Sequence, residues 1–461
     1  MSVQPIYAAG LLPGSAAGII NQIRSESSVD YQNSVPEMEE TTESIRRVGT
    51  AIVSYQPHMN EFVNALVNRI ALTILQSKVY YNDLKKFKKG ILELGENVQE
   101  IYVELAKPYD YLWKNFKDKE STVMKRTTPN VLSMYHTINY SKYYRNTVTE
   151  TMIRMAFTSL DGVYRFVDGI INSLISSANY DEYLVFKYSI DLLILNGIIK
   201  TIKYKDDSNT AKKIIDIKAN TDKFYFMRKD FNAAGVHSFC PKENAMIIIS
   251  ADFNAESSVD VLAYAFNLDK ADFIGNRFTI DSFHEFDWDR MDELFANDPN
   301  YKRFTEEEIT ALSNVDSILC DSDFIMIYEK LFDTGMSPWD AESRSYNVFL
   351  HDMKIITASP FKNAVAFAGN GAFAEISKVT VTPGSVSLNQ GDVYSFKASV
   401  ELASGGIANR GVVWSSQNPE KVAIDSFGNA KILTSSTEAV KIYATSAQDN
   451  TKKGEATINC N

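Results

Sequence analysis

The sequence predicts an α+β protein that ends in an all-β segment. Apolar residues at steps of three and four predict a long helix over about 149–178. Residues 200–375 mix strand-like runs with short helical segments, without the regular strand–helix rhythm of a parallel sheet. From Ile376, short alternating runs end at Pro or Gly about every ten residues, which is typical of a β-sandwich.

The composition is that of a folded protein. Its 461 residues are 45% hydrophobic and 23% charged, which excludes a wholly disordered or coiled-coil chain. A formal charge of −11 argues against a polycation that coats nucleic acid. The three cysteines, Cys240, Cys320 and Cys460, are too few for a disulfide scaffold and are expected to be buried apolar side chains. The aromatic share of 12% requires burial in cores or against other subunits.

The N-terminal stretch does not read as an export signal. Glycines and a proline interrupt its apolar residues, and no basic residue precedes Arg24. No later window reaches the roughly 18 to 20 uninterrupted apolar residues of a membrane span. We therefore expect a protein made in a cytoplasm, without a membrane segment.

Residues 1–56 are expected to form a loosely held N-terminal arm, because they are rich in Ser, Gly, Glu and Thr and lack sustained periodicity. From Met59 to Ile74, apolar residues recur at helical spacing and predict one buried helix face. Residues of about 79–125 are expected to form an extended hairpin that carries the basic run Lys85-Lys86-Phe87-Lys88-Lys89. A two-stranded ribbon is marginal alone, so we expect this one to lean on something else.

The long helix is expected to begin after Thr149, whose hydroxyl can cap the first turn, while Glu150 suits the positive end of the helix dipole. About thirty residues make a rod of about 45 Å, which is long for an enzyme helix. A second helix is expected from about Asp181 to Gly197, a residue suited to the left-handed conformation that ends many helices.

The motifs of common enzyme classes are missing from the sequence. It has no zinc-protease helix, phosphate loop or nucleophile elbow. Gly369-Asn370-Gly371-Ala372 fits the loose dinucleotide pattern but runs into β-type sequence, so a linker is favoured. One acidic cluster is the best candidate for a metal or acid–base site: Asp281, His284, Glu285, Asp287, Asp289, Asp292 and Glu293. Its interleaved aromatic residues favour a solvated or subunit-contact segment, and we expect no catalytic residue, cofactor or metal.

Four short elements of residues 376–461 have a recognisable pattern. They are Val379-Thr380-Val381-Thr382-Pro383, Val386-Ser387-Leu388-Asn389-Gln390-Gly391, Val412-Val413-Trp414-Ser415-Ser416 and Val422-Ala423-Ile424-Asp425. Together they resemble the bacterial Ig-like group 2 domain. The resemblance implies an all-β Ig-like sandwich but no particular function, because such modules decorate adhesins, glycosidases and phage proteins alike.

Further motifs are scattered before this segment. They are Leu84-Lys85-Lys86-Phe87-Lys88-Lys89-Gly90, Pro129-Asn130-Val131, Asp181-Glu182-Tyr183, Val259-Asp260-Val261-Leu262-Ala263-Tyr264 and Phe361-Lys362-Asn363-Ala364-Val365. Together they resemble the major capsid proteins of phi29-like podoviruses. The resemblance implies the Hong Kong 97-type capsid fold: an N-terminal arm (1–56), then a capsid domain (57–375) that contains the hairpin, a peripheral domain with a spine helix and an axial domain. The Ig-like domain (376–461) follows.

The leading hypothesis is a non-enzymatic major capsid protein whose copies form the icosahedral or prolate head shell around the double-stranded DNA of a tailed phage. The resemblance implies pentamers and hexamers of the chain, a scaffolding protein and a portal during assembly, head fibres as a further partner, and DNA enclosed without sequence-specific binding. Assembly in the host cytoplasm would place the protein in the virion.

On a projecting hairpin, the basic run suits an electrostatic contact with an acidic neighbour. We expect Lys85, Lys86, Phe87, Lys88 and Lys89 to contact an adjacent subunit. Aromatic residues outside the helical stripes, among them Tyr31 and Phe283, are likewise expected to be buried against other copies. The alternatives are a surface adhesin or receptor-binding protein that uses the Ig-like module, and a glycan-processing enzyme, which would need two carboxylates about 5 to 9 Å apart.

Overall fold

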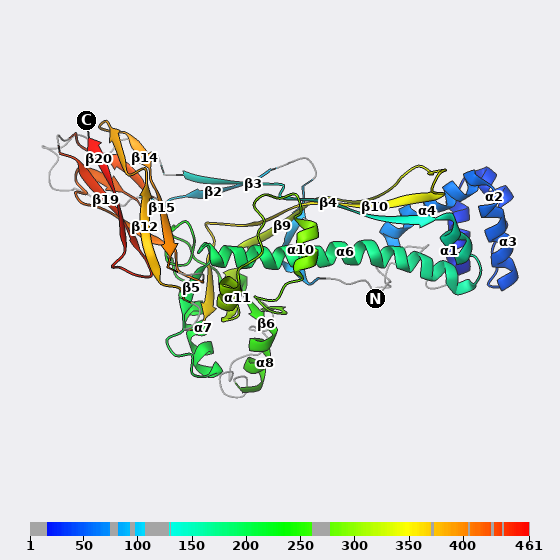
Figure 1. Ribbon diagram of the computed structural model, residues 1–461, viewed down its shortest axis with the longest axis horizontal. Coiled ribbons are helices and arrows are strands. Elements are labelled where there is room, and N and C mark those ends of the chain that lie inside the picture. The colour runs from blue at the N-terminus through cyan, green and yellow to red at the C-terminus, as the bar shows by residue number, and fades with distance from the viewer. Residues whose placement is uncertain are drawn as a thin grey trace, which may run out of the picture. The chain divides into compact units, whose positions relative to one another are not determined.

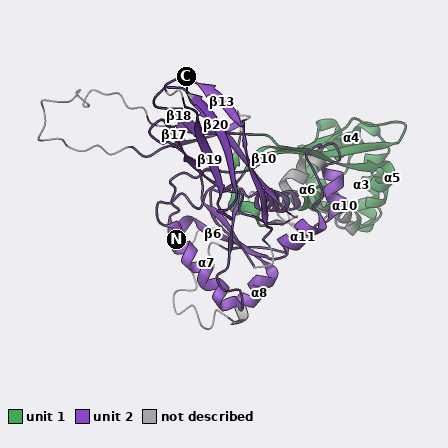
Figure 2. Cartoon of the chain, turned by 60° about the vertical axis from the view of Figure 1, so that its left-hand side comes forward, with its two compact units in different colours: residues 1–96, 137–183, 327–356 green, residues 97–136, 184–326, 357–461 purple. Residues whose placement is uncertain are grey.

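The chain divides into two compact units, which Figure 2 shows in different colours. The computed structural model describes residues 16–73, 82–92, 97–106, 129, 131–260, 277–369, 373–403, 406–425, 428–435 and 438–460. Unit 1 comprises residues 1–96, 137–183 and 327–356, and unit 2 comprises residues 97–136, 184–326 and 357–461. Much of the predicted hairpin (79–81, 93–96 and 107–128) and the loop residues 370–372 lie outside the described residues.

Unit 1 packs helices against a four-stranded sheet. The helices are α1 (Ala16–Glu26), α2 (Val29–Ser34), α3 (Thr42–Val53), α4 (Gln56–Thr73), the 3-10 helix η1 (Leu84–Phe87), α5 (Glu150–Ala156) and the first part of α6 (Leu160–Leu195). The strands are β1 (Lys88–Ile91), β9 (Ile325–Met336), β10 (Ser345–Ala358) and β4 (Tyr140–Thr149), in the order β1-β9-β10-β4. β4 and β10 are antiparallel and lie side by side in Figure 1.

The predicted arm is helical where it is described. In α3, Ile45, Val48 and Ile52 are fully buried and form one helix face, and the Thr41 hydroxyl caps the helix by accepting from the Ser44 N–H. Together with buried residues of α1, α2 and α4, this face belongs to the hydrophobic core of unit 1. The prediction of a loosely held arm was wrong for residues 16–53, because helices this short gain their stability from tertiary packing, which local periodicity does not reveal.

The two helices predicted over residues 149–178 and 181–197 have other bounds in the structure. The Thr149 cap is confirmed, since its side chain accepts from the Met152 N–H, but the helix it starts is α5 and ends at Ala156. α6, the long green helix of Figure 1, then runs without a break from Leu160 to Leu195. The predicted spine helix at 149–178 and the second helix from Asp181 are therefore wrong in their bounds. The apolar spacing continues across the turn between α5 and α6. Farther along α6, the buried carboxylate of Glu182 is accommodated within the helix because it pairs with Lys354.

A glycine of α3 lies where the helix touches α5. A Cβ added at Gly49 would lie 2.4 Å from the Cβ of Phe157. Gly49→Ala is expected to lower the free energy of unfolding by about 1–3 kcal/mol, because the overlap outweighs the gain of about 1 kcal/mol in helix propensity. Urea unfolding of the unassembled chain measures the change.

Gly169 of α6 is the matched control, because an added Cβ there meets nothing within 4 Å. Gly169→Ala is expected to stabilise the chain by up to about 1 kcal/mol. Equal effects of the two substitutions would contradict the contact between α3 and Phe157.

Unit 2 is built on a five-stranded mixed sheet. Its strands are β5 (Lys200–Lys203), β11 (Ala364–Ala368), β8 (Val315–Asp321), β6 (Ala245–Ser250) and β7 (Arg277–Ile280), in the order β5-β11-β8-β6-β7. The helices are the end of α6, α7 (Thr210–Phe224), η3 (Lys242–Asn244), α8 (Ala251–Asp260), α10 (Trp288–Leu294) and α11 (Glu306–Leu312). Every residue of β11 is buried, which explains its continuous apolar sequence.

In the described part of the predicted hairpin, the strands pair with other partners than expected. β1 pairs in parallel with β9 of unit 1, whereas β2 (Asn97–Val103) pairs with β3 (Val131–Thr137) of unit 2. β1 and β2 therefore do not form the expected two-stranded ribbon with each other. Sequence alternation identified extended segments here but not their partners, because pairing depends on residues far away in the chain.

The last segment is built of strands, as predicted. They are β12 (Ile376–Thr382), β13 (Ser385–Leu388), β14 (Val393–Ser395), β15 (Lys397–Leu402), β16 (Val412–Ser416), β17 (Val422–Ile424), β18 (Asn429–Ile432), β19 (Val440–Ser446) and β20 (Lys453–Cys460). They form sheets of the orders β13-β20-β19-β16, β14-β18-β17 and β12-β15. These strands enclose one apolar core, which includes Phe396, Ile432 and Ile442. The Ig-like fold stays a prediction.

Candidate functional site

The predicted basic segment begins in η1 and continues into β1. Lys85 and Lys86 are exposed, whereas Phe87 is fully buried within unit 1. Lys88 and Lys89 are half-buried at the start of β1, and the Lys88 ammonium is bound by carboxylates of its own unit. The structure thus separates the five residues: Lys85 and Lys86 are exposed, Lys89 is half-buried, and Phe87 and Lys88 hold the segment against the rest of unit 1.

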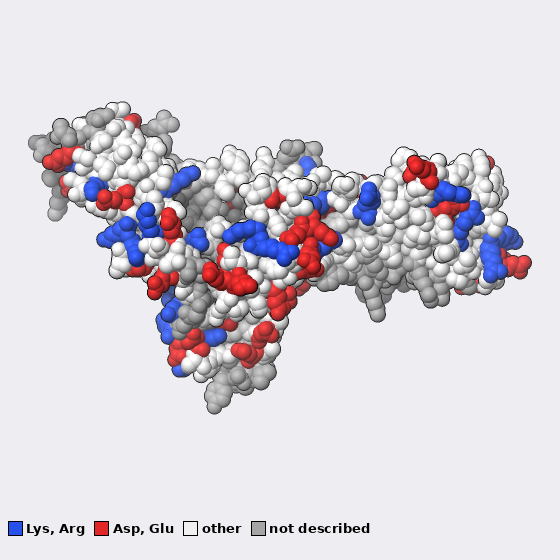
Figure 3. All heavy atoms as spheres, viewed as in Figure 1, with Lys and Arg blue, Asp and Glu red and all other residues white. Residues whose placement is uncertain are grey.

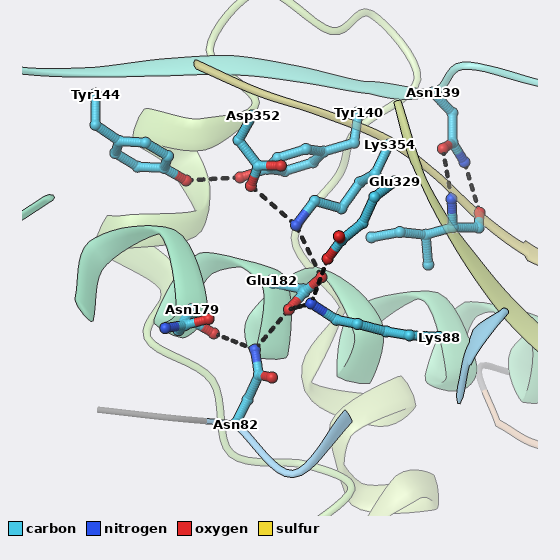
Figure 4. Close-up of polar contacts among 11 residues, drawn as sticks. Asn82, Lys88, Asn139, Tyr140, Tyr144, Asn179, Glu182, Glu329, Asp352 and Lys354 are labelled. Atoms are coloured by element: carbon cyan, nitrogen blue, oxygen red, sulfur yellow. Dashed lines mark hydrogen bonds and ion pairs between the residues drawn. The ribbon is translucent and has the colours of Figure 1, made fainter. Parts of the chain in front are cut away.

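Lys88 belongs to a cluster of buried and half-buried polar side chains between η1, α6, β9 and β10. We name this the Glu182 cluster, and it consists of Asn82, Lys88, Glu182, Glu329, Asp352 and Lys354 (Figure 4). The side chains of Glu182, Asp352 and Lys354 are 1%, 1% and 3% exposed. Such charges are buried at a cost that only close opposite charges and hydrogen bonds offset.

Glu182 lies at the centre of this cluster and accepts from three donors. Its Oε1 lies 2.8 Å from Lys354 Nζ, and its Oε2 lies 2.8 Å from Asn82 Nδ2 and 3.4 Å from Lys88 Nζ. Lys354 Nζ is also 2.9 Å from Asp352 Oδ2, and Lys88 Nζ is 2.7 Å from Glu329 Oε1. Two lysines are therefore shared among three carboxylates, which leaves one negative charge in excess when all are ionised.

The pKa values of the cluster follow from its burial and its lysines. Burial raises the pKa of Asp352 to about 6, although Lys354 opposes the shift. For Glu182, burial alone would raise the pKa, but Lys354 and Lys88 outweigh it and lower the pKa below its usual value. Burial likewise opposes the charge of Lys88, yet Glu182 and Glu329 raise its pKa.

Sequence reasoning singled out Lys88 but missed the rest of the cluster. In β10, Val348, Leu350, Asp352 and Lys354 are all buried and occupy alternate positions on one face of the strand. Two charged residues at inward positions of an otherwise apolar alternation are the signal that reveals a buried ion pair. Nothing local reveals Glu182 as the partner, because it lies 172 residues from Lys354 in the chain.

The ribbon of β2 and β3 has two unlike faces. On the inner face, His136 Nδ1 lies 2.7 Å from Thr357 Oγ1 and its Nε2 lies 3.2 Å from Glu100 Oε2, both within unit 2. On the outer face, the apolar side chains of Ile101, Val103 and Tyr135 are more than half exposed. An exposed apolar row on a two-stranded ribbon marks a surface suited to a partner.

The acidic segment that the sequence offered as a metal or acid–base candidate folds onto unit 2. Asp281 Oδ1 accepts from the buried ammonium of Lys187 at 2.9 Å. Asp292 pairs with Arg303, whose hydrogen bonds lower the pKa of this carboxyl. The Trp288 and Phe304 rings pack edge to face at 5.6 Å. Within the described residues, no group of three or more His, Cys, Asp or Glu side chains is placed to hold a metal ion.

The surface charges are mixed. On the face drawn in Figure 3, small groups of Lys and Arg alternate with groups of Asp and Glu, without a continuous basic field. This distribution agrees with the overall charge of −11 and argues against close adhesion of that face to phosphates. Among the described helices, none is long and apolar enough to cross a membrane.

Comparison with known proteins covers most of the chain. Residues 20–368 match the family described as Phi29-like phage major capsid protein. The chain is 30% identical to the major capsid protein of Bacillus phage B103, over 96% of this chain and 93% of that protein. It is 29% identical to the major capsid protein of Bacillus phage PZA, over 86% of this chain and 82% of that protein. Among solved structures, the capsid of Staphylococcus phage Andhra matches with a TM-score of 0.49 and 12% identity, over 64% of this chain and 86% of that one.

Proposed function

The chain belongs to the Phi29-like phage major capsid protein family, and on this premise we propose which of its surfaces join one copy to the next in the shell. It is a major capsid protein of a tailed phage, a component of the virion whose copies form the head shell. The match over residues 20–368 carries this conclusion and favours the shell protein over an adhesin.

The proposed contact surfaces are the exposed lysines of η1 and the outer face of the β2–β3 ribbon. The outer face carries Ile101, Val103 and Tyr135, each more than half exposed. Burial of this row against a neighbouring copy would remove apolar surface from water, at roughly 25 cal/mol for each Å². Lys85 and Lys86 add a charge that suits an acidic neighbour, since the chain as a whole is acidic.

The finer assignment of the fold is also a proposal. A long helix beside a four-stranded sheet in unit 1, with a five-stranded sheet in unit 2, supports the Hong Kong 97-type capsid fold. Nine strands around one core in residues 376–460 of the described chain support the Ig-like module. We further propose assembly through pentamers and hexamers with a scaffolding protein and a portal, head fibres as a further partner, and no catalytic activity. The enclosed double-stranded DNA is confined without sequence-specific contacts.

Reversing the two exposed charges of η1 tests the proposed contact. Lys85→Glu with Lys86→Glu is expected to reduce the yield of closed shells at least about tenfold, because each copy would place two negative charges against an acidic neighbour. The Glu182 cluster keeps Lys88, and urea unfolding of the monomer shows whether the variant retains its fold. Electron microscopy and sedimentation of assembly reactions measure the yield.

Lys378→Glu with Lys397→Glu is the matched control, since both lysines are exposed on the C-terminal strands. Normal shells from the η1 variant would overturn the proposed contact, and equal losses from both variants would show a general effect of charge.

The proposed assembly is tested by electron microscopy of the full chain produced together with a cognate scaffolding protein. Closed shells are expected. Persistent monomers at all protein and salt concentrations would contradict the proposed route of assembly.

A further inference from the structure

The segment that leads into the predicted hairpin is fastened to unit 1 at several points. We name residues 82–92 the root segment. Leu84 and Phe87 are fully buried, and Asn82 Nδ2 donates to the carbonyl of Asn179 on α6 at 2.7 Å as well as to Glu182. The Leu92 N–H donates to the carbonyl of Glu329 at 2.8 Å.

The strand within the root segment has a built-in irregularity. The register of β1 on β9 shifts between Lys88 and Gly90, and Gly90 has a φ of 142°, which residues with a side chain rarely adopt. A bulge of this kind lets a strand bend without loss of its remaining hydrogen bonds. The charge of Lys88 is thus fixed immediately before a point where the chain can change direction.

Lys88 makes two charged contacts within the root segment's surroundings. Its ammonium lies 2.7 Å from Glu329 of β9 and 3.4 Å from Glu182 of α6 (Figure 4). Glu182 divides its two oxygens between the root segment and Lys354 of β10. We propose that Glu182, shared between Lys88 and Lys354, is a latch whose hold on the root segment weakens when Asp352 takes up a proton.

The coupling follows from the groups that face Asp352. These are Lys354, Glu182 and Lys88, with the Tyr140 ring near Lys354 and with Tyr144 and Asp181 beyond it. Burial is the main cause that raises the pKa of Asp352, and Lys88 is among the charges that lower it. Linkage is reciprocal: if docked Lys88 favours the ionised form of Asp352, ionised Asp352 favours docked Lys88.

The sign of the pH effect follows directly. When all groups are ionised the Glu182 cluster holds one negative charge in excess, and a proton on Asp352 removes this charge, which weakens the attraction between the cluster and the Lys88 ammonium. As the pH falls through about 6, protonation therefore favours release. This inference rests on the proposed function for its role in assembly, because Lys85 and Lys86 of the root segment belong to the proposed contact surface.

Hydrogen exchange of the full unassembled chain tests the latch independently of shell formation. Lys88→Met is expected to raise the exchange rates of residues 82–92 at pH 7.5 by about tenfold, since both charged contacts of Lys88 are lost. Residues 345–351 of β10 are expected to exchange as before. Lys85→Met is the matched control and is expected to leave both segments unchanged, because Lys85 is an exposed neighbour in the same helical turn.

The pH dependence tests the role of Asp352. After correction for intrinsic exchange rates, residues 82–92 of the natural chain are expected to exchange at least about twofold faster at pH 5.5 than at pH 7.5. In Asp352→Asn, residues 82–92 are expected to exchange at both pH values as fast as those of the natural chain at pH 5.5. Unchanged exchange in Lys88→Met, or the same pH dependence in Asp352→Asn as in the natural chain, would overturn the latch. A chain that shows the latch but forms no shells would contradict the proposed assembly route and leave the latch standing.

Discussion

Replacing Lys354 by Met is expected to lower the free energy of unfolding by about 3–5 kcal/mol at pH 7.5. The side chain is 3% exposed, and its ammonium lies within 2.9 Å of both Glu182 and Asp352, which are each 1% exposed. Methionine preserves much of the apolar length but leaves two buried carboxylates with Lys88 as the nearest cation. Urea unfolding of the unassembled chain, followed by circular dichroism, measures the loss.

The loss is expected to shrink toward pH 5, because protonation neutralises the carboxylates that have lost their partner. Lys441→Met is the matched control: Lys441 is 44% exposed and pairs with Glu455 at 3.0 Å. Lys441→Met is expected to lower the free energy of unfolding by less than about 1 kcal/mol, as for other exposed ion pairs. A loss for Lys354→Met no larger than that of the control would contradict the account of the Glu182 cluster.

Asp191→Leu is expected to stabilise the chain by about 1–3 kcal/mol at pH 8. Asp191 of α6 is fully buried, and neither carboxyl oxygen has a hydrogen-bond partner among the described residues. Burial raises its pKa well above the usual value, and Lys187 offsets only part of the shift. Leucine branches at the same Cγ position and does not require a hydrogen-bond partner. Urea unfolding at several pH values measures the gain.

The pH dependence distinguishes this explanation from better packing. The carboxyl is protonated in the folded chain at pH values where it is ionised in the unfolded chain, so its contribution to stability falls as the pH rises from about 4 toward the folded-state pKa. The gain is therefore expected to be largest at pH 8 and smallest near pH 4. The side chain that Asp191→Asn introduces cannot ionise either, so the free energy of unfolding of this variant is expected to lack the pH dependence that Asp191 causes in the natural chain. A gain independent of pH would refute the buried acid as its cause.

The sequence predicted elements whose signals are local. The alternation in residues 376–461 identified strands, and Thr149 and Gly197 marked helix ends. Gly197, with a φ of 73°, has the left-handed conformation expected after a helix. The helices of residues 16–53 escaped prediction because each is short and its apolar face contributes only part of a shared core.

The aromatic residues show the same limit of prediction from local sequence. Tyr31, Phe87 and Phe283, which we expected to be buried against other copies, are at most 1% exposed within their own chain. They lie outside long periodic stripes, but a residue in a turn or a short helix can still point into a core. Tyr135 of β3, by contrast, is 58% exposed and belongs to the proposed contact surface. Composition and spacing thus identified large apolar side chains but not the surfaces that cover them.

Unit 1 is assembled from three separate stretches of the chain, and this order has a consequence for biosynthesis. During synthesis, Lys88 is made 241 residues before its partner Glu329, and Glu182 is made 172 residues before its partner Lys354. At ordinary translation rates the first interval is roughly 10 to 50 s. Throughout that time the nascent chain carries helices whose apolar faces lack their final cover, so aggregation competes with folding until the ribosome has passed residue 354.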